Sequence, residues 1–370
     1  ANQRHVEEQV PSPVLLQLLP TNTPESTPSI QRGSFHGAGG TLLGMQIVNV
    51  CLTIVTLGAY HFWAKAKIRR YLFSQTAFAG DRFAYHGTGK ELYQGFLKAM
   101  VVFGIPYFSL GAAHSFLALP QSVDFLLQAM AALVLFLYVP VAIVNARRYR
   151  CTRTSWRGIR FSFRGRTVDF LKLYFKGWLF TLLTLGTYYP YFQTQRQAFL
   201  HSHTYFGNQR FQFTGHGSGL MVPFAVTLFT TYAVLCLCGL ALALQLTNAG
   251  LTLLLIPFVL GPVWVWLLGQ KQKYYWDHTT FGEARFSSSI TWQRLFGLYL
   301  GNLALLLLTL GWAWPWVTVR NARFFIGTLS LQGLTDLDRV LQDTTETSVT
   351  GEGLSNLDYA YIAVELGKNR

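Results

Sequence analysis

The chain has 370 residues, of which 51% are hydrophobic, 15% aromatic and only 12% charged. A soluble domain usually has about 25% charged residues, so this composition excludes a disordered chain, a fibre and most water-soluble folds and indicates an integral membrane protein. The formal net charge is +14. Most basic residues follow apolar runs, where anionic lipid headgroups and the positive-inside rule explain them, so we expect no nucleic-acid partner.

The two ends of the chain differ in composition from the rest. Residues 1–32 are rich in Pro, Ser, Thr and Gln and predict a disordered tail, because such a segment cannot bury a core. From Arg323 to the end there are seven acidic and four basic residues. The four cysteines have no disulfide or metal-ligand spacing, and no recurring carboxylate accompanies the histidines, so we expect no metal and no other cofactor.

Two long apolar stretches each predict a pair of membrane-spanning helices, since one such helix needs about 20 apolar residues. The first pair covers roughly residues 97–119 and 123–146, and the second roughly 220–244 and 250–270. Basic residues follow each pair, at Arg147-Arg148 and at Lys271-Lys273. The positive-inside rule therefore places these ends of the helices in the cytoplasm.

Three shorter apolar runs share a Thr-Leu-Gly motif followed by aromatic residues, which indicates an internal repeat. The motif begins at Thr56, Thr184 and Thr309, and a proline follows the second and third glycines four residues later. An Asn lies nine residues before the first and third glycines. Two foldings fit these runs: either all of them cross the membrane, or each enters it and returns on the same side. We favour the re-entrant form.

Alternating aromatic residues around a Gly turn predict short β-hairpins. They cover residues 76–87, 154–165 and 204–215, and more loosely 279–289. Each contains an arginine that we expect to bind anionic headgroups or an acidic partner; these are Arg82, Arg160, Arg210 and Arg285.

Several motifs resemble the YjgN-like family of bacterial inner-membrane proteins. They are Phe35-His36-Gly37-Ala38-Gly39-Gly40, Thr56-Leu57-Gly58-Ala59-Tyr60, Trp63-Ala64-Lys65, Arg69-Arg70-Tyr71 and Gly351-Glu352-Gly353-Leu354. The resemblance covers about residues 33 to 358. It implies a multi-pass protein of the bacterial inner membrane. Separately, the positive-inside rule and the re-entrant form predict that the basic hairpin loops and the C-terminus lie in the cytoplasm. The function of the family is unknown, so it supplies no catalytic or binding residue.

We therefore predict an all-α multi-pass membrane protein, an internally repeated helical bundle with broken or re-entrant segments and short cytoplasmic β-hairpins. The predicted divisions are a tail at 1–32, membrane repeats at 33–168 and 169–293, a half-repeat at 294–333 and an acidic tail at 334–370.

The sequence contains no Ser-His-Asp, Cys-His or paired-carboxylate arrangement that would indicate an enzyme. We consider three hypotheses for the function, of which a lipid-modifying enzyme is the third. The first is a transporter or channel-like protein, because polar and helix-breaking residues recur in the Thr-Leu-Gly runs. The second is a non-transporting membrane scaffold or complex subunit that binds lipid headgroups or an acidic partner through its basic hairpins. The partner classes are thus anionic lipids, another protein or a homo-oligomer. Simple helix packing also explains the polar residues. The candidate pathway residues are Asn49, Thr56, Gly58, Thr184, Gly186, Pro190, Asn302, Thr309, Gly311 and Pro315.

Overall fold

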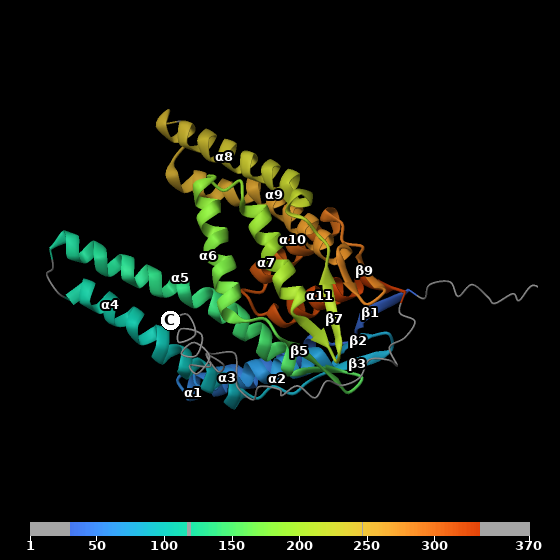
Figure 1. Ribbon diagram of the computed structural model, residues 1–370. Coiled ribbons are helices and arrows are strands. Elements are labelled where there is room, and N and C mark those ends of the chain that lie inside the picture. Colours follow the sequence, from blue (N-terminus) through green and yellow to red (C-terminus); the bar gives the residue numbers. More distant parts are fainter. Residues whose placement is uncertain (1–29, 117–119, 246, 334–370) are drawn as a thin grey trace, which may run out of the picture.

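The computed structural model describes residues 30–116, 120–245 and 247–333 (Figure 1). The predicted tails at 1–32 and 334–370 thus lie almost wholly outside the described residues, although the first strand already begins at Gln31. In chain order the elements are β1 (Gln31–Phe35), α1 (Gly39–Val55), α2 (His61–Ser74), β2 (Thr76–Phe78), β3 (Asp81–Tyr85), α3 (Gly89–Ala99), η2 (Met100–Gly104), α4 (Ile105–Phe116), α5 (Gln121–Thr152), β4 (Thr154–Trp156), β5 (Ile159–Phe163), α6 (Thr167–Leu183), α7 (Tyr189–Ser202), β6 (Thr204–Phe206), β7 (Gln209–Phe213), η3 (Gly217–Leu220), α8 (Met221–Ala243), α9 (Ala249–Asp277), β8 (Thr279–Phe281), β9 (Ala284–Ser288), α10 (Trp292–Leu308), α11 (Trp314–Gly327) and β10 (Leu329–Gln332).

The prediction of an all-α fold is wrong, because the strands of the described chain form a closed antiparallel barrel in the order β1-β10-β9-β8-β7-β6-β5-β4-β3-β2. The predicted hairpins are present as β2–β3, β4–β5, β6–β7 and β8–β9. A lone hairpin leaves both edges unpaired, and closure into a barrel removes these edges. Neighbouring hairpins therefore pair across the helices that separate them in sequence, and β1 pairs with β10 to close the barrel.

All the helical segments leave the barrel at the same rim. Phe35 pairs with Thr76, Tyr85 with Thr154 and Phe163 with Thr204, so the end of each odd strand lies beside the start of the next even strand. The tight turns that join β2 to β3 and its counterparts lie at the opposite rim. We call these edges of the barrel the helix rim and the turn rim.

Between these strands the chain runs out and back through pairs of helices, which also pack side by side around the barrel axis. Helix α2 packs against α3, α5 against α6, α9 against α10, and α11 against α1. In Figure 1 the ends of the helices that lie away from the strands point to the left and upward, and the strands lie at the lower right.

Among the described residues, four helices are long and apolar enough to cross a membrane, which confirms the two predicted helix pairs. They are Gly89–Ala113, Gln121–Thr152, Gly217–Ala243 and Ala249–Asp277. Helices α1 and α10, of 17 residues each, extend only about 25 Å at 1.5 Å per residue.

The Thr-Leu-Gly motif forms the turn within each of three short helix pairs, which are α1–α2, α6–α7 and α10–α11. The leucine has a positive φ of 49° in all three turns, and the following glycine has a φ between 88° and 93°. The threonine hydroxyl donates to the carbonyl four residues earlier, as from Thr56 to Leu52 at 2.8 Å. It also accepts from the amide four residues later, as from Tyr60 at 2.9 Å. These bonds satisfy backbone groups that a helix end leaves unpaired.

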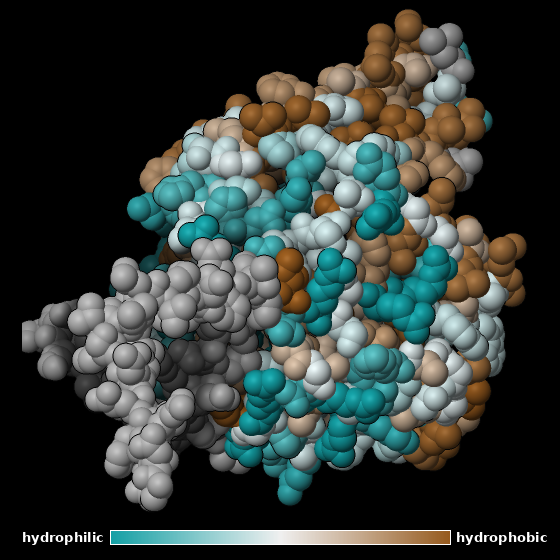
Figure 2. All heavy atoms as spheres, turned by 90° about the vertical axis from the view of Figure 1, so that its right-hand side faces the viewer, coloured by the Kyte–Doolittle hydropathy of each residue, from teal (hydrophilic) through white to brown (hydrophobic). Residues whose placement is uncertain are grey.

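The surface separates into two regions. Figure 2 looks onto the side of the molecule where the strands lie, and its middle carries mostly hydrophilic residues. Hydrophobic residues gather toward the top of this view, where α8 and α9 lie in Figure 1. The helix-pair turns are strongly apolar as well, since Leu57 is 97% exposed and Leu310 is 91% exposed. Apolar surface of this extent favours contact with lipid.

Candidate functional site

A belt of aromatic side chains lines the inside of the barrel. Strand registers place Phe83 beside Trp156, Phe161 beside Phe206, and Phe211 beside Phe281. Two further members, Phe78 and Phe286, lie on the flanking strands. We call the following eight residues the aromatic belt: Phe78, Phe83, Trp156, Phe161, Phe206, Phe211, Phe281 and Phe286.

The rings of the belt contact one another from strand to strand. The centroids of Phe161 and Phe206 are 4.8 Å apart, and those of Phe211 and Phe281 are 4.9 Å apart. Tilted ring pairs at this separation are favourable beyond simple burial, by about 0.5–1.5 kcal/mol each. The belt is interrupted where β10 closes the barrel, because Leu331 occupies the place of an aromatic residue there.

Polar groups line the barrel nearer the helix rim. Thr204 and Thr279 are the first residues of their strands, and each hydroxyl donates to a carbonyl at the end of the preceding helix, at 2.7 and 2.6 Å. Arg147 of α5 and His201 of α7 reach the same space from the ends of their helices. The Arg147 Nη2 donates to Thr204 Oγ1 at 3.4 Å.

The belt and this polar layer line a cavity of about 430 Å³. Small-molecule sites commonly have volumes of about 300–1,000 Å³ and mainly apolar walls with few polar groups. Besides the aromatic belt, the cavity is lined by Phe73, Arg147, Arg150, Cys151, Thr154, His201, Thr204, Trp276, Thr279, Leu329 and Leu331. Sequence reasoning did not find this site, because its residues come from segments far apart in the chain.

The side chains that line the cavity carry a net positive charge. No Asp or Glu lies among the described residues that line it. Burial, and then the charge of Arg147, lowers the pKa of His201 to about 4. At neutral pH this histidine is therefore uncharged, and Arg147 and Arg150 supply positive charge to the cavity wall.

The predicted arginines Arg82, Arg160, Arg210 and Arg285 each occupy the second position of a strand that follows a tight turn. Because Phe83, Phe161, Phe211 and Phe286 next to them line the cavity, the alternation along a strand directs these arginines to the outside of the barrel. Arg32 occupies the equivalent place on β1, where it pairs with Ser330. The sequence pattern could have revealed it, since Arg32 precedes Phe35-His36-Gly37 as Arg82 precedes Tyr85-His86-Gly87. We call these five residues the arginine girdle.

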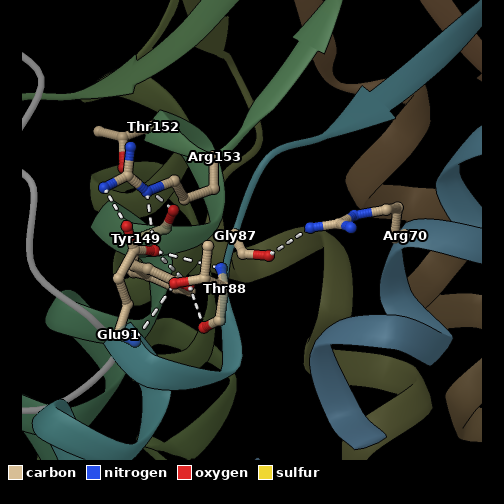
Figure 3. A network of polar contacts seen from close by, with 7 residues as sticks. All are labelled: Arg70, Gly87, Thr88, Glu91, Tyr149, Thr152 and Arg153. Carbon is tan, nitrogen blue, oxygen red and sulfur yellow. Dashed lines mark hydrogen bonds and ion pairs between the residues drawn. The ribbon is translucent and has the colours of Figure 1, made fainter. Parts of the chain in front are cut away.

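An ion pair fixes the start of α3 to the end of α5 (Figure 3). The Arg153 guanidinium donates to both oxygens of Glu91, at 2.8 and 3.2 Å, and the Tyr149 hydroxyl donates to Oε2 of Glu91 at 2.9 Å. Thr88 and Glu91 also form a capping box at the N-terminus of α3. Glu91 thus holds together the first long helix pair and the barrel end beside it.

The structure separates the predicted pathway residues into different places. The turns of three separate helix pairs contain Thr56, Gly58, Thr184, Gly186, Thr309 and Gly311. Pro190 and Pro315 are the second residues of α7 and α11. Asn49 is buried, with no hydrogen-bond partner for its side chain in the described structure, and lines a cavity of about 480 Å³ beside Trp314. The buried Asn302 donates to Asn321 at 2.8 Å. Gly186 and Pro190 line a different cavity, of about 310 Å³.

Comparison with known proteins confirms the family resemblance. The model of a family described as "Bacterial protein of unknown function (DUF898)" matches residues 30–357. The chain is 35% identical over 130 residues to inner membrane protein YjgN of Escherichia coli O157:H7, and 33% identical over 131 residues to the Salmonella typhimurium protein of the same name. Each match covers 35% of this chain and only 30% of the relative. No solved structure matches the chain.

Proposed function

The chain belongs to the DUF898 family of bacterial proteins, and we propose that it is an inner-membrane transporter or channel-like protein whose solute chamber is the barrel cavity. The observation that carries this proposal is the junction between the cavity and the long helices. Arg147 and Cys151 at the end of α5, and Trp276 at the end of α9, line the cavity. Both helices are long and apolar enough to cross a membrane.

This proposal moves the solute site from the Thr-Leu-Gly runs to the barrel. The threonine hydroxyls of those runs bond to backbone groups across each turn, so their recurrence has a structural reason. The exposed leucines of the turns suit hydrocarbon. In this arrangement the three short helix pairs insert into the bilayer and return, while the long pairs cross it.

The barrel lies in the cytoplasm in this proposal. The basic residues Arg147, Arg148, Lys271 and Lys273 lie in the last turns of α5 and α9, at the helix rim of the barrel. The positive-inside rule places such ends on the cytoplasmic side. The opposite ends of these helices begin at Gln121 and Ala249 and would then lie on the other side of the membrane.

The test is release of solutes from proteoliposomes that contain the purified full-length protein. The vesicles are loaded with a mixture of small organic acids, amines and neutral solutes, and efflux is followed by mass spectrometry. Leu331→Trp fills the cavity and should abolish the efflux that the wild type causes, whereas Leu237→Trp, at an exposed site on α8, should not. Efflux no faster than from protein-free vesicles would contradict the proposal.

The arginine girdle favours a second candidate, a scaffold that binds lipid headgroups or an acidic partner. A ring of like charges on the outer face of a barrel is suited to a polyanionic surface. Here the combined change of Arg82, Arg160 and Arg210 to Gln should release a co-purifying partner or anionic lipid, while Leu331→Trp should have no effect on that association.

A further inference from the structure

The barrel cavity has a chemistry that narrows the class of solute. Resting on the proposed function of the cavity as the solute chamber, we infer that it binds a small amphipathic anion. Such a molecule has an aromatic or aliphatic body with one carboxylate or sulfonate group. The aromatic belt encloses the body, and Arg147 binds the anionic group.

The first support is the apolar wall. Trp156, Phe206 and Phe281 are 6%, 3% and 8% exposed, so their rings are packed into the wall and present fixed faces. The hydrophobic effect favours an apolar group of the solute that replaces water against these faces. At Leu331 the cavity wall is aliphatic instead of aromatic.

The second support is the state of Arg147. Its Nε is buried and has no hydrogen-bond partner in the described structure, and its Nη2 makes only the long contact with Thr204. A buried N–H of a charged group without an acceptor is costly. An anion in the cavity supplies that acceptor, and guanidinium groups bind carboxylates with two parallel hydrogen bonds.

The third support is the absence of a carboxylate of the protein that could take this place. Glu91 bonds to Arg153, Asp81 pairs with Arg157, and Asp277 accepts from the amide of Ser288. None of the described acidic residues lines the cavity. His201 is uncharged at neutral pH because burial lowers its pKa to about 4, so the positive charge of the cavity wall comes from Arg147 and Arg150.

The two layers of the cavity also give the solute an orientation. Arg147, Thr204 and Thr279 lie near the helix rim, and the belt residues of the even strands lie two positions further along the strand toward the turn rim. The anionic group would therefore face the membrane helices, and the apolar body would face the turn rim. The threonine hydroxyls already donate to helix carbonyls, so the guanidinium is the principal donor for the anion.

Equilibrium binding to the purified full-length protein in detergent tests this inference separately from transport. Three probes are compared: naphthoate, a free aromatic acid; decanoate, which represents an acid released from lipid; and naphthalenemethanol, a neutral analogue of the first. Arg147→Gln removes one of the two arginine charges that line the cavity and leaves Arg150 in place. Lys90→Gln removes one charge from an exposed site on α3 as the matched control.

The wild type and Lys90→Gln should bind at least one of the two acids saturably, and Arg147→Gln should weaken that binding by on the order of ten- to a hundredfold. The preferred acid distinguishes an aromatic solute from a lipid-derived one. Arg147→Lys keeps the charge and should retain part of the affinity, which separates charge recognition from a folding defect. Unchanged binding of the acids by a folded Arg147→Gln variant would overturn the inference. Equal affinity for naphthoate and naphthalenemethanol, with no binding of decanoate, would overturn it as well. Binding without efflux would instead reject transport alone.

Discussion

The carboxylate of Glu91 and the guanidinium of Arg153 form an ion pair with two hydrogen bonds (Figure 3). It joins the first turn of α3 to the residue that directly follows α5. Both side chains are mostly buried, with 17% and 11% of their surfaces exposed. Because α3 to α5 form one of the helix pairs that leave the helix rim, this bond fixes both ends of that pair against the barrel.

Removal of one member of this pair should therefore destabilise the protein. Glu91→Ala leaves the Arg153 guanidinium buried without its partner and should lower the free energy of unfolding by about 3 kcal/mol. Thermal unfolding in detergent measures this change. The double variant with Arg153→Met should recover part of the loss, and an equal or larger loss in the double variant would contradict the role of the pair.

The aromatic belt should make a large contribution to the stability of the barrel. Phe206 is 3% exposed and contacts Trp156, Phe161 and Phe281. Phe206→Ala removes these contacts and should cost about 3 to 5 kcal/mol. Phe229→Ala, at a 71% exposed site on α8, is the matched control and should cost much less in detergent. Similar losses in both variants would count against a packed belt.

Stability should fall in acid because of His201. Its pKa is lowered from the ordinary 6.5 to about 4 by burial and by Arg147, so between these pH values the unfolded chain binds more protons than the folded one. The free energy of unfolding should therefore decrease as pH falls from about 6.5 to about 4, by on the order of 3 kcal/mol in total. His201→Phe should remove this part of the dependence, and His61→Asn, at an exposed site, should retain it. An unchanged profile in His201→Phe would exclude His201 as the cause.

The sidedness of the barrel can be measured at the tight turns. Asn208 lies in the turn between β6 and β7, which is cytoplasmic in the proposed arrangement. A single cysteine at this position, in a chain without the four native cysteines, should react with a membrane-impermeant reagent in inverted vesicles and not in intact spheroplasts. Labelling from the periplasmic side would place the barrel in the other compartment.

The sequence allowed the elements of the fold to be predicted, but not their assembly. Gly80 and Gly158, each among alternating aromatic residues, mark hairpins that are present, and the apolar runs mark the long helices. Closure of the barrel depends on pairs such as Tyr85 with Thr154, whose partners are separated by a complete helix pair. No local pattern specifies such a pairing, so the hairpins were predicted as separate units.

The candidate site was missed for a related reason. Phe83, Phe161 and Phe211 each have a local role as strand residues, and only the barrel brings them to one cavity. The strand β1 escaped detection because it lies beside a tail of biased composition and has Gly33 at the place of these phenylalanines. The Thr-Leu-Gly motifs, in contrast, could be recognised in the sequence. Each forms a helix–helix turn with the same positive φ angles, so the same residues recur at the same positions.

An experimental structure determined in the presence of naphthoate would show whether the barrel cavity holds a solute. We expect density for the ring system between Phe206, Phe281 and Leu331, with the carboxylate against the Arg147 guanidinium. A barrel whose interior is completely filled by its own side chains, or naphthoate bound only among the lipid-facing helices, would contradict this expectation.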